Sequence, residues 1–538
     1  MGTQSEPPLD VLLVGYEKQQ NLGLRSILAY VRSKGYRAEI VPFSPNCPEA
    51  VLRAAQAFKP RVIGFSLIFQ FALAEFAGLM RALRESGVTA HFTAGGHFPS
   101  LRPVDTLELL PDLDSIVRFE GEETLIEFLG SLDRPTRWPD IRGLAFRRGN
   151  EAVVTELRPL VADLDSLPSL DHGDPIMLAD GVRMASMLAS RGCLFNCSFC
   201  SIRQFYGSAG GALRRTRSPQ RVVAEMKDLH DRQGVRVFLF QDDDFAARTP
   251  RQRAWLHAYL DALDAAGLSK RVKWKISCRV DDLDRALLRE MTQRGLIMVY
   301  LGVESGNPAG LRLINKRVTV GQNRAAIALL NELDIEMAMG FMLLDPSSTF
   351  AILRENIAFL EAAGSSGRFP INFCRMVPYA GTPIEAQLRA EGRLTGTLIE
   401  PDYDFLEPRI GPYAYLVNRI FKQRNNDRDG LVARISEASF DHRLDCALNG
   451  RPEDTSYREA LRGLTRHAND LAIRTLSTLL DTIQAGDVAA LLQEQDALLR
   501  IAEDEWRGEA EIAGALGGLL SERNVTMRES ELASAHAG

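Results

Sequence analysis

The sequence of 538 residues contains few cysteines, histidines and aromatic residues: 7 Cys, 8 His and 7% Phe, Trp and Tyr. Seven cysteines in so long a chain exclude a small disulfide scaffold and indicate a reducing compartment, which we expect to be the cytoplasm. With 42 Gly, 25 Pro and 45% hydrophobic residues, the composition also excludes collagen-like and disordered chains. At about 150 residues per domain, the length predicts three or four domains.

Neither sign of charge dominates: the sequence has 64 Lys and Arg and 70 Asp and Glu, which gives a net charge of −6. This balance argues against a nucleic-acid partner, since such a surface depends on phosphate contacts. The N-terminus lacks the basic segment of a signal peptide, so we expect none. One long apolar stretch runs from Val62 to Met80, but Gln70 and Glu75 interrupt it. Its first half alternates like a strand, which predicts a buried strand and a helix rather than a membrane span.

The first third of the chain alternates strands with amphipathic helices, which predicts parallel βαβ units in a doubly wound, Rossmann-like α/β domain over residues 1–132. Its main strands are expected at Asp10–Tyr16, Arg37–Ser44, Arg61–Phe69 and His91–Gly96. Residues 133–182 are rich in Pro and Asp and predict a linker segment with one hairpin around Leu144 to Val154.

From Met184 onward a second series of strands begins, each followed by a helical pattern. Six such units are too few for a full eight-stranded barrel, so we expect a partial (β/α)6 barrel over residues 183–400, with its site at the C-terminal strand ends. Residues 401–538 are mostly helical in pattern and form a predicted C-terminal domain that shapes or covers the substrate pocket. The six strands read ASMLAS, VRVFLFQ, VKWKISCRV, LIMVYLGVE, IEMAMGFMLL and INFCRMV.

The strongest motif is a cluster of three cysteines, Cys193, Cys197 and Cys200, spaced C-x3-C-x2-C directly after the first barrel strand. Three thiolates on one short loop can hold a [4Fe–4S] cluster and leave one iron open to a chelating ligand. A closed zinc site is the alternative, but it requires four ligands and this loop supplies three. The spacing therefore favours an iron–sulfur cluster.

This loop and its position resemble the radical S-adenosylmethionine (SAM) superfamily, and the resemblance extends roughly from Ala185 to Leu394. It implies that the amino and carboxylate groups of SAM chelate the open iron. One electron, which an electron donor such as flavodoxin or ferredoxin provides, then cleaves SAM into methionine and a 5′-deoxyadenosyl radical. Phe199 matches the aromatic residue that packs near the adenine.

Other residues at strand ends match the SAM contacts of the superfamily. Where many members have Gly-Gly-Glu facing the SAM amino group, this chain has Asp242, Asp243 and Asp244. Arg279 matches a partner for the SAM carboxylate, and Glu304 and Ser305 match the ribose-contact position. An Arg fork suits a carboxylate, and acceptor side chains suit ribose hydroxyls. The alternatives are a solvated loop for the aspartates and surface or structural roles for the others.

The first domain resembles the cobalamin-binding domain of cobalamin-binding radical SAM enzymes. In a doubly wound sheet, ligands bind at the carboxyl ends of the strands, and a Gly-Gly pair there lets a flat ligand approach the backbone. The motif Asp-x-His-x-x-Gly is absent, so no histidine ligand to cobalt is expected from it. An empty, degenerate domain is the alternative. The matching residues are Asn21, Leu22 and Gly23 before Leu24 and Arg25, then Ser66, Gly95, Gly96, Glu120, Gly121 and Glu122.

The other cysteines predict no site. Cys278 and Cys374 lie in barrel strands, where we expect them to be small buried hydrophobic residues, and Cys47 and Cys446 look incidental. No Walker loop or nucleophile elbow is present in the sequence.

The resemblance implies an enzyme that uses a [4Fe–4S] cluster, SAM and cobalamin, and its closest form is a class B radical SAM methyltransferase. Such an enzyme transfers a methyl group from methylcobalamin to an unactivated carbon and consumes two SAM molecules. Two alternatives remain: a rearrangement, cyclisation or oxidation without methyl transfer, and a non-catalytic cobalamin sensor or docking protein. The substrate is expected to be a small molecule or a peptide, with no membrane partner, and the pattern identifies no individual catalytic residue.

Overall fold

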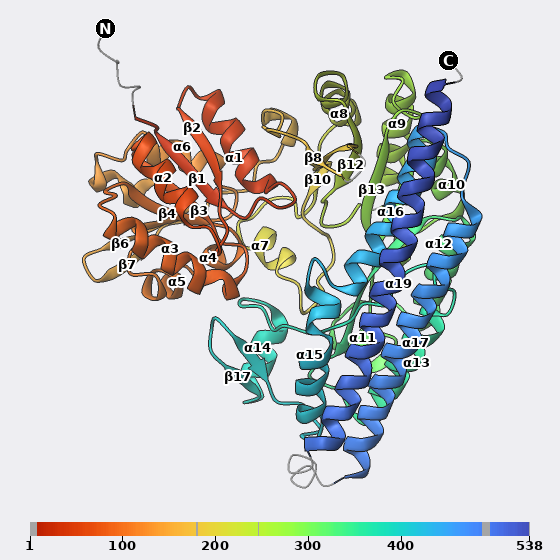
Figure 1. Ribbon diagram of the computed structural model, residues 1–538. Helices are drawn as coiled ribbons and strands as arrows, with labels where there is room; N and C mark the ends of the chain where they lie inside the picture. The colour runs from red at the N-terminus through yellow and green to blue at the C-terminus, as the bar shows by residue number, and fades with distance from the viewer. Residues whose placement is uncertain (1–7, 179–180, 246, 487–494, 537–538) are drawn as a thin grey trace. The chain divides into compact units, whose positions relative to one another are not determined.

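The computed structural model describes residues 8–178, 181–245, 247–486 and 495–536 (Figure 1). The chain folds into two compact units, each described here by itself. Unit 1 comprises Met1–Met177, Arg183–Asp244 and Val377–Tyr403, and unit 2 comprises Leu178–Val182, Phe245–Met376 and Asp404–Gly538. The division into four domains at residues 132, 182 and 400 stays a prediction.

The N-terminal part of unit 1 is built on a seven-stranded sheet of order β2-β1-β3-β4-β5-β6-β7. The first five strands pair in parallel, and the hairpin expected near residue 150 extends the sheet as antiparallel β6 and β7. The strands are β1 (Val11–Gly15), β2 (Ala38–Pro42), β3 (Val62–Ser66), β4 (His91–Gly95), β5 (Ser115–Val117), β6 (Leu144–Arg148) and β7 (Glu151–Val154). The helices are α1 (Leu22–Ser33), α2 (Glu49–Phe58), α3 (Leu73–Glu85), α4 (His97–Leu101), α5 (Pro103–Leu109) and α6 (Glu122–Leu129).

Helices cover both faces of this sheet. Leu13 packs in a core with residues of α1 and α6, whereas its neighbour Val14 packs in a second core with residues of α2 and α3. Burial on both faces explains why β1 is an unbroken apolar run. The stretch from Val62 to Met80 forms β3 and α3, as predicted. Within the four described ranges, no helix is long and apolar enough to span a membrane.

The rest of unit 1 starts the second strand series. Strand β9 pairs in parallel with β12 and antiparallel with β8, and β10 forms a two-stranded antiparallel sheet with β11. These elements are β8 (Ile176–Met177), β9 (Arg183–Met187), β10 (Ser190–Arg191), α7 (Ile202–Ser208), β11 (Arg215–Thr216), α8 (Pro219–Gln233) and β12 (Val235–Phe240). A later segment adds α14 (Pro383–Ala390), β17 (Leu394–Gly396) and β18 (Pro401–Tyr403).

Unit 2 contains the other four strands of this series, which pair in parallel in the order β13-β14-β15-β16. All six predicted barrel strands are therefore present, and the predicted fold class is confirmed. The elements of this part are α9 (Pro250–Ala265), β13 (Lys273–Arg279), α10 (Arg285–Gln293), β14 (Leu296–Glu304), α11 (Pro308–Leu313), α12 (Val320–Glu332), β15 (Glu336–Leu344), α13 (Phe350–Gly364) and β16 (Cys374–Arg375).

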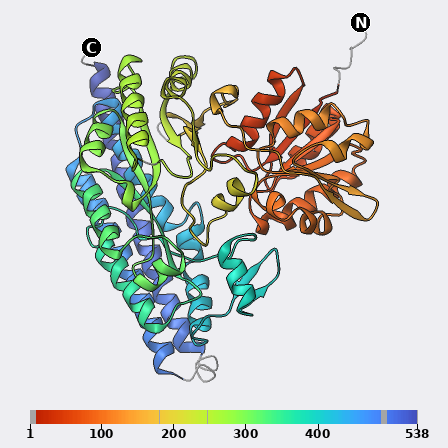
Figure 2. The ribbon, with the colours of Figure 1, turned by 180° about the vertical axis from the view of Figure 1, so that it is seen from behind.

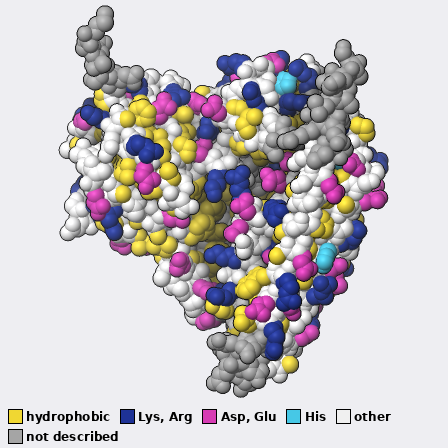
Figure 3. Space-filling view, in the orientation of Figure 1, with side chains coloured by type: hydrophobic (Ala, Val, Ile, Leu, Met, Phe, Trp, Pro, Cys, Tyr) yellow, Lys and Arg dark blue, Asp and Glu magenta, His cyan; other side chains and the backbone are white. Residues whose placement is uncertain are grey.

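The end of the chain is helical, as predicted. Helices α17 and α19 lie side by side in both views (Figures 1 and 2), and an apolar core that includes Ile435, Leu461 and Leu516 joins them to α16. Charged side chains of both signs are spread over the face shown in Figure 3, as the balanced composition leads one to expect. The helices are α15 (Ile410–Asn426), α16 (Leu431–Asn449), α17 (Thr455–Ala485) and α19 (Gln495–His536).

Candidate functional site

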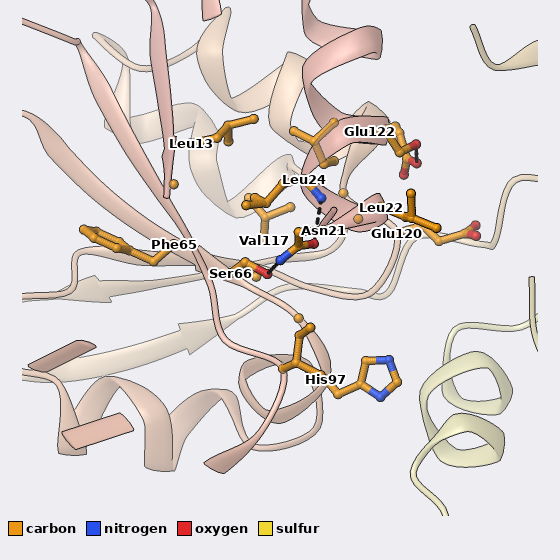
Figure 4. Close-up of a pocket in the computed structure, with 18 of the residues that line it drawn as sticks. Leu13, Asn21, Leu22, Leu24, Phe65, Ser66, His97, Val117, Glu120 and Glu122 are labelled. Carbon is orange, nitrogen blue, oxygen red and sulfur yellow. Dashed lines mark hydrogen bonds between the residues drawn. The ribbon is translucent and has the colours of Figure 1, made fainter. Parts of the chain in front are cut away.

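A cavity of about 570 Å³ lies in unit 1 over the carboxyl ends of β1, β3 and β4. Strand order reverses between β1 and β3, and doubly wound sheets bind their ligands at such a point. The start of α1 and the loop between β5 and α6 form part of the walls (Figure 4), which also include Leu188, Arg191, Phe205, Tyr206 and Gln241. All nine residues that the sequence predicted to face cobalamin line this cavity, and their contact with cobalamin stays a prediction: Asn21, Leu22, Gly23, Ser66, Gly95, Gly96, Glu120, Gly121 and Glu122.

Asn21 fixes the start of α1 against the end of β3. Its side-chain oxygen accepts a hydrogen bond from the Leu24 N–H at 3.1 Å, which caps the helix. Its side-chain nitrogen donates to the Ser66 hydroxyl, also at 3.1 Å (Figure 4). Two of the predicted residues therefore shape the cavity by holding one another in place.

The Gly-Gly pair at the end of β4 has a structural role besides the predicted one, which stays a prediction. Gly96 has φ +117°, and a Cβ there would lie 2.4 Å from the carbonyl oxygen of Leu67. A Cβ on Gly95 would lie 3.2 Å from the carbonyl oxygen of Val117. Gly96 therefore allows two backbone segments to approach each other, in addition to lining the cavity.

The carboxylates of Glu120 and Glu122 are paired with arginines from the antiparallel strands β10 and β11. The Glu120 carboxylate lies 3.0 Å from Arg191 Nη1 and 2.8 Å from Arg215 Nη1. The Glu122 carboxylate lies 2.7 Å from Arg191 Nη2, and the Ser26 hydroxyl donates to it at 2.8 Å. We call Ser26, Glu120, Glu122, Arg191 and Arg215 the Arg191 network; its two cations balance its two anions.

The Arg191 network is charged although it is buried. The side chains of Glu122 and Arg191 are 3% and 13% exposed. Burial opposes ionisation of Glu122, but the Arg191 charge and hydrogen bonds from Arg191 and Ser26 hold the pKa of Glu122 below its ordinary value. Burial likewise opposes the Arg191 charge, but Glu122 and Glu120 raise the pKa of Arg191. Removing one partner would leave a buried charge unpaired, at a cost of about 3–5 kcal/mol.

Strand β10 ends at Arg191, two residues before Cys193, and Asp243 binds the backbone between these two residues. The Gly192 N–H donates to the Asp243 carboxylate at 2.8 Å. Burial, with a smaller contribution from the charge of Asp242, raises the pKa of Asp243 to about 6. Asp243 is therefore ionised at neutral pH and both holds the loop and offers negative charge next to it.

The carboxylate of Asp242 is occupied by hydrogen bonds from other residues of the protein. It accepts hydrogen bonds from the Ala189 N–H at 3.1 Å and from the Ser190 hydroxyl, and it is buried. Asp244, also buried, accepts from the Arg214 side chain through its backbone carbonyl at 3.1 Å. The predicted contact between an aspartate of this stretch and the SAM amino group stays a prediction, and Asp242 is the least available of the three for it.

The three cysteines lie on the loop between β10 and α7, where the Cys200 N–H donates to the Cys197 carbonyl at 3.2 Å. Cys197 is buried, and Cys193, Cys200 and the adjacent Phe199 are half-buried. Burial raises the pKa of Cys193 and that of Cys200 to about 12 each. Both are thiols at neutral pH in the free protein, so iron binding must release their protons.

This donor set fits a polynuclear cluster. Among the described residues, no group of three His, Cys, Asp or Glu side chains is placed to hold a single metal ion. A [4Fe–4S] cluster makes a different demand, because each thiolate binds a different iron. Cys193, Cys197 and Cys200 would hold three irons, and the assignment of these residues as ligands stays a prediction.

Three further predicted SAM residues lie in unit 2, and each has a partner there. Arg279 donates to the Asp281 carboxylate at 3.0 Å and to the Lys316 carbonyl at 2.5 Å. Glu304 ends β14 with φ +68° and pairs with Lys316 Nζ at 3.0 Å. Ser305 is buried, and its hydroxyl bonds within the turn that follows. Their contacts with SAM stay predictions.

Two cavity residues carry signals that the sequence analysis missed. Arg191 stands immediately before the Gly-Cys that opens the cysteine motif, and His97 immediately follows the Gly-Gly pair. The His97 ring stacks on Phe205 of α7 with centroids 4.3 Å apart, and Nδ1 lies 3.0 Å from the Ser201 hydroxyl. Burial lowers the pKa of His97 to about 4, so its ring is neutral at pH 7.

The predictions for the two barrel cysteines have opposite outcomes. Cys278 on β13 is buried, as predicted, but Cys374 on β16 is exposed, so that prediction is wrong. Strand β16 has two residues and pairs with β15 at the end of the sheet order. A residue on so short an edge strand has neighbours on one side only and is left uncovered.

Replacing Cys193, Cys197 and Cys200 together by Ala should abolish iron binding and the visible absorbance of thiolate-bound iron after anaerobic reconstitution, because no other donor stands on this loop. Iron content and the absorption spectrum measure the effect. Cys47→Ala and Cys374→Ala should bind as much iron as the parent. A triple variant with the parent's iron content would refute the ligand assignment.

Filling the cavity should weaken cobalamin binding. Gly23 lines the cavity near the start of α1, and a Cβ there meets only the Asn21 side chain, at 3.4 Å. Gly23→Leu should therefore lower the affinity for hydroxocobalamin at least about tenfold, or ~1.4 kcal/mol, in an absorbance titration. Gly78→Leu is the matched control, because Gly78 is exposed on helix α3 with open space around it. Equal affinities for the two variants would place the ligand elsewhere.

Gly96→Ala should destabilise unit 1 in the absence of any ligand, since it combines an unfavourable φ with a clash against the Leu67 carbonyl. We expect a loss of about 1–3 kcal/mol in the free energy of unfolding. Denaturant unfolding of the apoprotein measures it, with Gly95→Ala as the milder comparison. If Gly96→Ala is no less stable than Gly95→Ala, the backbone role of Gly96 is wrong.

Two protein families match this chain. The model of the B12 binding domain matches residues 9–129, which contain the cavity-lining strand ends and loops. The model of the Radical SAM superfamily matches residues 187–360, which begin just before the cysteine loop. The two matches cover the five parallel strands of the N-terminal sheet and most of the second strand series.

Two curated proteins are similar to this chain. An anaerobic magnesium-protoporphyrin IX monomethyl ester cyclase of Cereibacter sphaeroides is 31% identical over 57% of this chain, and the match spans about half (49%) of the cyclase. A hopanoid C-3 methylase of Methylococcus capsulatus is 25% identical over 62% of this chain and 63% of the methylase.

A solved structure has the same fold over nearly the whole chain. It is the cobalamin-dependent SAM radical enzyme OxsB with aqua-cobalamin bound, with a TM-score of 0.67 at 14% identity, and the match covers 98% of this chain and 81% of OxsB. The two family matches confirm the cofactors that the sequence predicted at the level of the family: cobalamin, SAM and a [4Fe–4S] cluster. This chain therefore has both domains that define a cobalamin-binding radical SAM enzyme, a B12 binding domain and a Radical SAM domain.

Proposed function

We propose that this protein is a cobalamin-dependent radical SAM methyltransferase that adds a methyl group to an unactivated carbon of its substrate. The observation that carries the proposal is that the cobalamin cavity and the cysteine loop belong to one compact unit. Arg191 lines the cavity, and Cys193 follows it by two residues. When bound, SAM with the cluster supplies a carbon-centred radical, and cobalamin supplies the methyl group.

The residues of the chain position these groups. Three cysteines hold the cluster, and the carboxylate of Asp243 beside them can accept a hydrogen bond from the iron-bound SAM amino group. Apolar side chains such as Leu22 and Val117 and neutral His97 line the cavity and limit access of water. Keeping two reactive groups close to one carbon is an orientation problem, in which well-placed groups gain most of their advantage from geometry.

Relatives support two versions of the reaction. The hopanoid C-3 methylase supports methyl transfer. The magnesium-protoporphyrin IX monomethyl ester cyclase, at 31% identity, supports a second candidate: a radical ring closure in which no methyl group is transferred. The third reading, a cobalamin sensor without catalysis, has less support because all three cysteines are present on a loop that fits a cluster.

Methyl transfer makes a definite stoichiometric prediction. With its substrate, methyl-deuterated SAM and a strong reductant under anaerobic conditions, the reconstituted protein should form S-adenosylhomocysteine, 5′-deoxyadenosine and deuteromethylated product in about a one-to-one-to-one ratio. One SAM provides the methyl group, and the other provides the radical. Mass spectrometry of a time course measures all three.

The outcomes separate the three versions. Deoxyadenosine formed without S-adenosylhomocysteine, and a product without deuterium, would refute methyl transfer and favour ring closure or another radical step. No cleavage of SAM by the reductively treated protein would refute both enzymatic versions and favour the sensor. The variant without the three cysteines is the control for background cleavage.

A further inference from the structure

Both ends of the cysteine loop contact residues that line the cobalamin cavity. Before the loop, Arg191 bonds to Glu122 and to the Ser26 hydroxyl, at 2.7 and 2.8 Å. After the loop, the Ser201 hydroxyl lies 3.0 Å from Nδ1 of His97. Ser26, Glu122 and His97 all line the cavity. The loop that carries Cys193, Cys197 and Cys200 is thus fixed to the cavity wall on either side.

The contact through Arg191 is the stronger of the two, because it is ionic and buried. Arg191 reaches Glu120 on the loop between β5 and α6 and Glu122 at the start of α6, and Arg215 also pairs with Glu120. Gly192 is the one residue between Arg191 and Cys193, and its N–H is bound to Asp243. A fixed Arg191 side chain therefore restricts the backbone at Cys193. Arg191 is therefore the residue that links the conformation of the cavity wall to that of the cysteine loop.

We propose that Arg191 is a positioning residue that couples the two cofactor sites: cobalamin in the cavity strengthens cluster binding by the cysteine loop, and the cluster strengthens cobalamin binding. The inference rests on the cofactors in the proposed function and is independent of which reaction they perform. The Arg191 network would thus couple the two cofactor sites, a role distinct from direct contact with either cofactor.

The physical reason is the exchange of water for ligand at the cavity wall. In the empty cavity, Arg191, whose side chain is 13% exposed, is still open to water, which weakens its bonds to the buried carboxylates. A ligand that fills the cavity excludes this water, strengthens the ion pairs and restricts the start of the loop. Linkage makes the effect reciprocal, so each cofactor must raise the affinity for the other by the same factor.

The test measures the hydroxocobalamin dissociation constant by absorbance titration, with apoprotein and with cluster-reconstituted protein, without SAM or substrate. The cluster should tighten binding about fivefold or more in the parent, within the usual range of coupling between sites. Arg191→Gln should bring this ratio near one. Arg191→Lys should restore part of it, because Lys keeps the charge but lacks the planar fork that reaches two carboxylates.

A matched control is an arginine that pairs with another carboxylate of α6. Arg158 pairs with Glu127 of α6 at 2.5 Å and does not line the cavity. Arg158→Gln should therefore keep the parent's ratio. A second readout uses the apoprotein alone: hydroxocobalamin should slow iodoacetamide labelling of Cys193, Cys197 and Cys200 in the parent and in Arg158→Gln, but not in Arg191→Gln.

Each result decides the proposal. A ratio of one in the parent, or a parent-like ratio in Arg191→Gln, overturns it. If Arg191→Gln does not fold, Glu122→Gln takes its place with the same expectations. Failure of methyl transfer would leave these binding ratios unchanged, so this inference and the proposed reaction fail separately. Lack of hydroxocobalamin binding in the parent overturns both this inference and the proposed function.

Discussion

Two carboxylates that have almost no access to water determine how unit 1 is put together. Glu120 and Glu122 follow β5, and a buried anion without a cation would cost several kcal/mol of a total stability of about 5–15 kcal/mol. The cation for Glu122 comes from Arg191, 69 residues later in the chain. This requirement joins the N-terminal sheet to the segment that carries the cysteines and makes them parts of one compact unit.

The pairing of β10 with β11 shows how strict this requirement is. Arg191 lies directly opposite Arg215 in the antiparallel register, an arrangement of like charges that is normally unfavourable. It becomes favourable because Glu120 places one carboxylate oxygen on each arginine. Next to this pair, Gly192 has φ +86°, and a Cβ there would lie 1.8 Å from the Leu213 carbonyl. Only glycine therefore fits at position 192, where the cysteine loop begins.

The sequence predicted what depends on local pattern. Strand ends follow from apolar runs, and parallel strands end at one edge, so residues as distant as Asn21 and Glu122 could be expected around one cavity. It did not predict the partners of those residues. Nothing near Glu120 indicates Arg191 or Arg215, because ion pairs between distant segments have no periodicity. The exposure of Cys374 was not predicted for a similar reason. The composition of a strand does not reveal that β16 has only two residues and lies at an edge of the sheet.

The edges of the first sheet have a consequence for self-association. An open strand edge presents unpaired N–H and carbonyl groups, which can template pairing with another chain. One edge is β2, which ends at Pro42, a residue without an N–H to donate. The other is β7, a strand of four residues that begins with Glu151. Proline on one edge, and a short strand with a charge on the other, protect this sheet against growth into a larger β-assembly.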